Sequence, residues 1–165
     1  AIPLNDDELI EFDLYSEPFL LYDCSTSKLK SAIAIQELDY SKLWLIEEGH
    51  CLRTQVQNIC ELSDKSQEKN INIEFKAGSL DSLLRFTRAS KGVTILPYLA
   101  SLSLSKSEQK KLVPFKLPTP VRSIGLVTHK YFVKTKLLDQ LQVTIRQVVA
   151  PLIPHNPSTK QFKPL

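Results

Sequence analysis

Two cysteines nine positions apart, Cys51 and Cys60, occur in a segment that otherwise has the pattern of one α-helix. Nine residues of helix advance about 13.5 Å and rotate by about 900°, which places the two side chains on opposite faces. A disulfide requires Cα atoms roughly 4.4–6.8 Å apart, so these cysteines can pair only if the helix unwinds. The segment must therefore either keep two separate thiols or change its shape on oxidation.

Cys51 is expected to be the more reactive of the two thiols. Gly49 ends the apolar run before it, and the helical pattern begins after that glycine, so Cys51 falls in the first turn. Backbone N–H groups and the positive end of the helix dipole lie there, with His50 and Arg53 within one turn. These surroundings favour the nucleophilic thiolate. Cys60 lies deeper in the helix among apolar residues, so we expect Cys51 to attack an oxidant and Cys60 to resolve the product.

Other uses of the cysteines remain open at this point. Unpaired cysteine is among the most buried residue types, and it commonly packs as a small hydrophobic side chain. A zinc site built from His50, Cys51, Cys60 and Cys24 is disfavoured, because structural zinc sites prefer two to four residues between their cysteines and no two cysteines here have that spacing. We therefore expect no metal and no cofactor. Cys24 has no basic neighbour in the sequence and is expected to be structural.

Composition narrows the class of protein. A chain of 165 residues with 42% hydrophobic content can form one domain or two small subdomains. A net charge of +3 is too small to indicate nucleic-acid binding, and residues 129–136 are expected to form a solvated loop. Three cysteines without a secreted pattern indicate a reducing compartment, so we expect the cytoplasm. No apolar stretch reaches the ~18 residues of a membrane helix, and we expect no membrane partner.

Apolar periodicity predicts an α/β fold in which strands alternate with helices and pair in parallel. Ser16-Glu17 is expected to separate the first two strands, and the tail from Pro151 is expected to be disordered. The predicted strands are Ile10–Tyr15, Pro18–Tyr22, Leu43–Ile46, Asn72–Lys76, Gly92–Pro97 and Arg122–Val127. The predicted helical segments are Ile35–Leu38, His50–Leu62, a helix capped by Ser79, and Thr135–Val149.

The order of several motifs resembles the regulatory domain of the OxyR family, the hydrogen-peroxide sensors among LysR-type transcription regulators. The most specific motif is Gly-His-Cys-Leu-Arg at 49–53 with a second cysteine nine residues after the first. Thr54 departs from the family pattern, where an aspartate is common, and Asn58-Ile59 replaces a glycine-aromatic pair. The other motifs that carry the resemblance are Glu17-Pro18, Ser79-Leu80, Gly92-Val93-Thr94-Ile95-Leu96-Pro97 and Arg122-Ser123-Ile124-Gly125-Leu126-Val127.

The resemblance implies an α/β, periplasmic-binding-protein-like regulatory domain of two subdomains, with the second complete and the first present in part. Residues 1–16 would end the first subdomain, 17–121 would form the second with the redox helix, and 122–150 would supply a returning strand and helix. Residues 151–165 would be a flexible tail. The DNA-binding domain of the family and the opening of the first subdomain would have no counterpart in this chain.

The resemblance also implies a function. The chain would be the redox-sensing domain of a peroxide-responsive transcription activator, not an enzyme, and it would switch through a reversible Cys51–Cys60 disulfide. Gly49, His50, Arg53 and Arg122 would contact the oxidant or the reactive sulfur. The implied partners are hydrogen peroxide, a homodimer or tetramer, DNA through the absent domain, RNA polymerase, and thiol reductants such as glutaredoxin or thioredoxin.

Two other functions compete with this one. The chain could be a LysR-type effector domain that binds a small anion near Ser79, with both cysteines incidental, although Ser79 is better suited to cap a helix than to contact a ligand. A peroxide-consuming enzyme is disfavoured, because turnover requires a recycling partner and the sequence contains no peroxidase motif.

Overall fold

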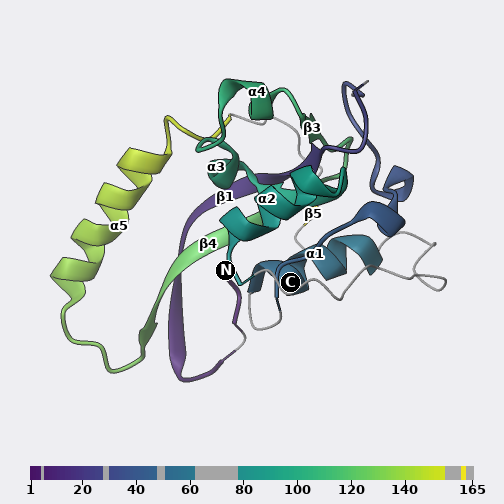
Figure 1. The fold of residues 1–165 in the computed structure, drawn as a ribbon. Coiled ribbons are helices and arrows are strands. Elements are labelled where there is room, and N and C mark those ends of the chain that lie inside the picture. The colour runs from purple at the N-terminus through teal and green to yellow at the C-terminus, as the bar shows by residue number, and fades with distance from the viewer. Residues whose placement is uncertain (5, 28–29, 48–50, 62–77, 155–160, 163–165) are drawn as a thin grey trace.

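The computed structural model describes residues 1–4, 6–27, 30–47, 51–61, 78–154 and 161–162. Its centre is a sheet in the order β2-β1-β4-β5, with β3 also paired to β1. Helices pack on both sides of β1, and α5 lies beside the long β1–β4 ribbon (Figure 1). The strands are β1 (Leu9–Asp23), β2 (Val93–Pro97), β3 (Leu112–Pro114), β4 (Thr119–His129) and β5 (Gln161–Phe162).

Strand β1 changes partners along its length. Residues 9–18 pair antiparallel with 121–129 of β4, whereas residues 19–23 lie between β2 and β3. The predicted break between two strands at Ser16-Glu17 is therefore wrong, and a single strand runs through this position. These two polar residues have partners on β4, since Ser16 Oγ lies 3.0 Å from Ser123 Oγ and Glu17 forms an ion pair with Arg122. Cross-strand polar partners allow a strand to continue where the sequence pattern suggested a break.

The prediction of parallel pairing is also wrong for the main ladders. β1 pairs antiparallel with β2, β3 and β4, and among the described residues the parallel ladder is the short one between β4 and β5. The pair Asp23–Val93 explains the direction, because β2 begins beside the end of β1. Parallel pairing would require the intervening chain to return to the start of β1.

Most of the predicted helices are confirmed. Ser79 caps α2, because its Oγ accepts a hydrogen bond from the Ser82 backbone N–H at 3.2 Å. The predicted strand Leu43–Ile46 is wrong, since Leu43 forms an isolated bridge with Val93. The predicted strand Asn72–Lys76 lies outside the described residues. The helices are η1 (Ile35–Glu37), η2 (Tyr40–Lys42), α1 (Cys51–Glu61), α2 (Leu80–Ala89), α3 (Tyr98–Ser101), α4 (Lys106–Gln109) and α5 (Thr135–Val149).

Two apolar clusters lie on opposite faces of the sheet. Neighbouring residues of a strand point to opposite faces, so Leu21 joins one cluster and Tyr22 joins the other. The larger cluster contains residues from β1, β2, β3, the 33–45 segment and α1. The smaller one joins Tyr22 to Leu84 of α2 and to Leu96 and Leu104. The larger cluster therefore fixes α1 against the sheet.

Helix α5 buries less of its apolar surface than its sequence pattern predicts. Leu138 is buried against the rest of the fold, whereas Leu137, Leu141 and Val148 are exposed. The loop predicted at 129–136 is confirmed at residues 130–134, whereas His129 ends β4 and Thr135 begins α5. The tail prediction is wrong at residues 161–162, which form β5 beside β4. None of the described helices combines the length and apolar character needed to cross a membrane.

Candidate functional site

The two cysteines of the sequence motif lie on opposite faces of α1. Cys51 is the first residue of the helix and is exposed, whereas Cys60 is 2% exposed. The helix is continuous between them, so their separation along the axis is about 13.5 Å at the standard rise. Neither is in a disulfide. The predicted helix and the predicted separation of the thiols are both confirmed.

Apolar residues of α1 hold it against the sheet. Val56, Ile59 and Cys60 are buried in the larger apolar cluster, and Leu52 packs against both that cluster and the buried pair Ile46 and Leu83. These positions recur every three or four residues, which is the spacing of one helix face. Unwinding α1 would therefore expose buried apolar surface as well as break its hydrogen bonds.

Arg53 anchors the first turn of α1 from the inside. Its side chain is 6% exposed, and Nη1 donates a hydrogen bond of 2.8 Å to the backbone carbonyl of Ile46. The described contact is thus structural, and the predicted support of an oxidant at Cys51 stays a prediction. Gly49 and His50, the other predicted site residues beside Cys51, lie outside the described residues.

Arg122 on β4 forms an ion pair with a buried glutamate. Its Nη2 lies 2.8 Å from Glu17 Oε1, and its Nε donates to the same oxygen at 2.9 Å. Glu17 is fully buried, and its Oε2 accepts a 2.6 Å hydrogen bond from the Leu99 N–H at the start of α3. Among the described residues, no polar contact joins Arg122 to Cys51. Its predicted role at the reactive thiol also stays a prediction.

Tyr40 makes a contact with α1 that the sequence did not predict. Its hydroxyl lies 3.4 Å from the backbone carbonyl oxygens of both Ile35 and Cys60, so it can donate to either. This contact joins η2 to the last turn of α1. Residue 40 lies between the predicted elements Ile35–Leu38 and Leu43–Ile46, where a tyrosine gives no sequence signal for a partner 20 residues away.

Gln55 is a second contact that sequence reasoning missed. Its side chain is buried, and Oε1 has no hydrogen-bond partner among the described residues. Leaving such an acceptor unpaired costs about 1–3 kcal/mol. The available signal was its helical spacing, because residue 55 is three positions after Leu52 and falls on the inward face of the helix.

Trp44 links the start of α1 to strand β2. Its backbone N–H donates to the Val93 carbonyl at 2.9 Å, and Thr94 Oγ1 donates to the Trp44 carbonyl at 2.8 Å. The indole meets the Phe86 ring edge to face, with centroids 4.6 Å apart. It also packs on Ile46, the residue whose carbonyl Arg53 binds. Trp44 thus borders the cluster that receives the first turn of α1.

Cys24 has a basic neighbour in space, although it has none in the sequence. Lys111 Nζ lies 3.8 Å from Cys24 Sγ. The pairing of Tyr22 with Leu112 brings Lys111 beside Cys24, although the two residues are 87 positions apart. Cys24 is half-buried and packs against the smaller apolar cluster. Its position is consistent with the expected structural role.

The described residues give no support to a metal centre or to an exposed serine site. No three His, Cys, Asp or Glu side chains of the described part of the chain gather where they could hold a metal ion. Ser79 Oγ donates to Ser82 Oγ at 3.0 Å in addition to accepting from the Ser82 N–H. The Ser79 hydroxyl therefore serves the start of α2.

Comparison with known proteins identifies the family. Residues 1–149 match the model of the LysR substrate binding domain. The chain belongs to the LysR substrate-binding domain family. It is 30% identical over 148 residues to the DNA-binding transcriptional dual regulator OxyR of Escherichia coli K12, a match that covers 88% of this chain and 47% of that protein. It is 28% identical over 154 residues to the HTH-type transcriptional regulator EstR of Acinetobacter baylyi, covering 92% of this chain and 50% of that protein.

The fold of this LysR-type domain agrees with solved structures. Reduced OxyR from Porphyromonas gingivalis superposes with a TM-score of 0.78 at 29% identity, covering 96% of this chain and 72% of that one. The expected regulatory-domain fold and the resemblance to OxyR are therefore confirmed. The chain spans about half the length of the curated relatives it matches.

Proposed function

We propose that this chain is the redox-sensing part of a peroxide-responsive LysR-type regulator that switches through a reversible Cys51–Cys60 disulfide. The observation that carries the proposal is the placement of an exposed thiol and a buried thiol at opposite ends and on opposite faces of one helix. The likeness to OxyR, including its reduced form, supports it. Relatives named hydrogen peroxide-inducible genes activators indicate the oxidant.

The proposed chemistry has two steps. The Cys51 thiolate attacks one oxygen of hydrogen peroxide, the O–O bond breaks, and the leaving hydroxide takes a proton to become water. The product is a sulfenic acid at Cys51. The Cys60 sulfur then attacks the Cys51 sulfur, an S–S bond forms, and a second water leaves. Two thiols lose two electrons in total, and one peroxide becomes two waters.

The second step requires α1 to unwind, because its ends are too far apart for a disulfide. Unwinding removes Val56, Ile59 and Cys60 from the larger apolar cluster, which opposes the change. The unpaired Oε1 of Gln55 favours it, since the acceptor can bind water once the helix opens. Packing therefore stabilises the helical form of α1, and the unpaired Gln55 Oε1 destabilises it. Such opposing contributions allow the helical and unwound forms to be close in free energy.

The remaining partners belong to the same proposal. DNA would be bound through a domain outside this chain, and RNA polymerase and thiol reductants such as glutaredoxin or thioredoxin would act on the whole regulator.

We assign residues 1–16 and 122–150 to the first subdomain and 17–121 to the second. The exposed apolar side chains of α5, Leu137, Leu141 and Val148, support its packing against the rest of a first subdomain or a second copy.

Counting thiols tests the proposal. The reduced protein is treated with one equivalent of hydrogen peroxide, and its peptides are mapped by mass. We expect rapid loss of two thiols and a Cys51–Cys60 disulfide. Cys51→Ser should abolish the rapid reaction, and Cys60→Ser should yield a dimedone adduct at Cys51 without a disulfide. Cys24→Ser is the matched control and should behave like the parent.

Each competing function has its own result in this assay. An effector domain with incidental cysteines would lose no thiol rapidly. An enzyme would continue to consume peroxide when a reductant is supplied. Rapid, stoichiometric oxidation of the Cys51→Ser variant would show that Cys51 is not the nucleophile.

A further inference from the structure

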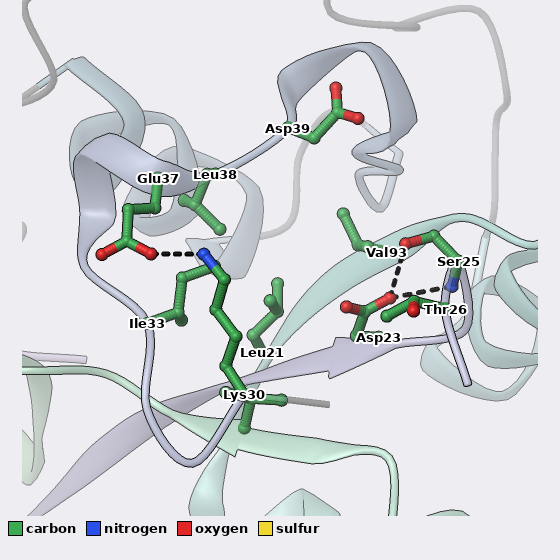
Figure 2. Close-up of a pocket in the computed structure, with 11 residues that line it drawn as sticks. Leu21, Asp23, Ser25, Thr26, Lys30, Ile33, Glu37, Leu38, Asp39 and Val93 are labelled. Carbon is green, nitrogen blue, oxygen red and sulfur yellow. Dashed lines mark hydrogen bonds and ion pairs between the residues drawn. The ribbon is translucent and has the colours of Figure 1, made fainter. Parts of the chain in front are cut away.

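A cavity of about 280 Å³ lies at the end of β1, beneath the segment that leads to η1 and η2. Its floor is apolar and consists of buried side chains from three strands and the 33–38 segment (Figure 2). None of its described lining residues comes from α1, so it is separate from the redox helix. The floor residues are Leu21, Ile33, Leu38, Val93 and Val113.

One end of the cavity carries two positive charges and one negative charge, and both positive side chains are exposed to water. Lys30 and Glu37 form an ion pair there (Figure 2). Lys116 Nζ lies 2.8 Å from Glu37 Oε1. Hydrogen bonds from Lys116 and Lys30 lower the pKa of Glu37 to about 2. Both lysine side chains are more than half exposed, so water screens their charges. A charged group of a ligand would therefore interact only weakly with the side chains at this end.

The other end has a carboxylate with an unused oxygen. Asp23 is half-buried, and its Oδ1 accepts hydrogen bonds from the Ser25 N–H at 2.8 Å and the Ser25 hydroxyl at 2.7 Å (Figure 2). Oδ2 has no hydrogen-bond partner among the described residues. Asp39 also lines the cavity, but its carboxylate is bound by Ser41 and by Lys42 at 2.9 Å.

The charges at this end sum to a net negative value. Asp23 and Asp39 contribute two negative charges, and Lys42, which is paired with Asp39, contributes one positive charge. Lys42 also responds to Asp23, since its pKa is raised by the hydrogen bond with Asp39 first and by the charge of Asp23 to a smaller degree. One negative charge remains beside an apolar floor, which favours a ligand with one positive group and a hydrocarbon body.

We propose that this cavity binds a small apolar amine. Its ammonium group would donate to Asp23 Oδ2, and its hydrocarbon part would cover Leu21, Val93 and Val113. Charge-assisted hydrogen bonds of this kind are about twice as strong as neutral ones, so the carboxylate determines the ligand class. The volume is just below the usual range of about 300–1,000 Å³ for ligand pockets, which suits a short aliphatic amine.

The apolar floor of the cavity connects it to the redox helix. Leu21, Ile33 and Leu38 belong to the same apolar cluster as Cys60. Tyr40, the residue after Asp39, contacts the Cys60 carbonyl. A ligand that holds these floor residues in their present positions stabilises the helical form of α1 and slows disulfide formation. This coupling rests on the proposed function, whereas the binding site itself does not.

A titration with three compounds of one carbon skeleton tests the site. Isobutylamine, isobutanol and isobutyrate are added separately to the reduced, ¹⁵N-labelled chain at pH 7, and backbone amide shifts are followed by NMR. We expect saturable shifts at Asp23, Ser25 and Val93 with isobutylamine, binding at least about tenfold weaker with isobutanol, and none at these residues with isobutyrate.

Two variants localise the charge that binds the amine. Asp23→Asn keeps an acceptor for Ser25 and removes the charge, and it should weaken isobutylamine binding about tenfold. Asp81→Asn removes an exposed carboxylate of α2 that pairs with Arg85, and it should leave binding unchanged. Equal binding of the three compounds, absence of saturable shifts, or full affinity in folded Asp23→Asn would overturn the proposal. If Asp23→Asn does not fold, the comparison of the three compounds still decides it.

The coupling is measured separately from the binding. Disulfide formation is followed with one equivalent of peroxide in the presence and absence of saturating isobutylamine, and we expect it to be slower with the amine. An unchanged rate would overturn the coupling and leave the site standing. If no disulfide forms under either condition, the proposed function fails, and the NMR titration still decides whether the amine site exists.

Discussion

Glu17 on β1 and Arg122 on β4 face each other across the sheet and form an ion pair of 2.8 Å in which the glutamate is fully buried. The pair lies where β1 leaves β4 and passes between β2 and β3. The second oxygen of Glu17 holds the Leu99 N–H at the start of α3. One carboxylate therefore joins two strands and a helix at the point where the sheet divides.

Arg122→Met should destabilise the protein more than Glu17→Gln. Removing the arginine leaves a buried carboxylate with one hydrogen bond, and breaking a buried pair in this way costs about 3–5 kcal/mol. Removing the glutamate charge costs less, because Arg122 retains access to water with its side chain 19% exposed. The free energy of unfolding in urea measures both.

The double variant Glu17→Gln/Arg122→Met provides the control for this pair. It should lose less stability than the sum of the two single variants, because neither partner is left as an unpaired charge. Strict additivity of the three values would show that the two side chains do not interact in solution.

Tyr40→Phe should accelerate disulfide formation. The change removes the hydrogen bond to the last turn of α1 and keeps the ring in the apolar cluster. A hydrogen bond of this kind contributes about 0.5–1.5 kcal/mol, which corresponds to roughly two- to tenfold in the unwinding step. Quenched-flow trapping of thiols after peroxide measures the rate. Tyr131→Phe is the matched control at an exposed tyrosine, and an equal acceleration there would contradict the assignment.

The elements that sequence predicts well are those with a strong local signal. Ser79 followed by an apolar helical pattern gave the start of α2, and the spacing of Leu52, Val56 and Ile59 gave α1 and the opposite placement of its cysteines. Helix periodicity and capping act over a few residues, so one short window contains the information.

The features that sequence did not predict depend on contacts between distant segments. The direction of β2 relative to β1 is fixed by where the chain re-enters the sheet, which no local pattern records. Tyr40 meets Cys60, and Lys111 meets Cys24, only after the fold brings them together. Arg122 and Glu17 were each recognised as part of a motif, but their pairing was not predicted. The two residues are 105 positions apart, and no local pattern indicates that their strands lie side by side.

Glu37 should stabilise the folded protein in a defined pH window. Its pKa is lowered from 4.5 to about 2 by hydrogen bonds from Lys116 and then Lys30. A depressed folded-state pKa contributes stability that is present above the unfolded value and is lost as the pH falls through the folded value. In Glu37→Gln, the free energy of unfolding should therefore depend less on pH between about 4.5 and 2.

Thermal unfolding of the parent and the Glu37→Gln variant across this pH range gives the difference curve. Asp81→Asn is the control, because Asp81 is paired with Arg85 on the exposed surface of α2. A difference curve that is flat for Glu37→Gln and sloped for Asp81→Asn would contradict the assignment.

Gly92→Ala should displace Trp44. A Cβ at position 92 would lie 2.2 Å from Trp44 Nε1 and 2.9 Å from the Lys42 backbone carbonyl, so the ring and the chain behind it must move. Overpacking of this kind costs about 1–3 kcal/mol. Gly78→Ala is the control, because its Cβ would meet Glu47 Oε2 at an ordinary 3.5 Å. In urea unfolding, Gly92→Ala should lower the free energy of unfolding more than Gly78→Ala. Similar losses in the two variants would contradict the close approach of Trp44 to Gly92.

Trp44 should report the opening of α1 by its fluorescence. It is the one tryptophan of the chain, and it packs with Leu52 against the buried pair Ile46 and Leu83. Unwinding α1 would remove Leu52 from this cluster and admit water to the indole, so emission should shift to longer wavelength when the disulfide forms. Cys60→Ser should form the sulfenic acid without the shift, because nothing then holds the helix open. Stopped-flow fluorescence of both proteins after peroxide measures this, and an identical shift in Cys60→Ser would show that oxidation of Cys51 opens the helix without the disulfide.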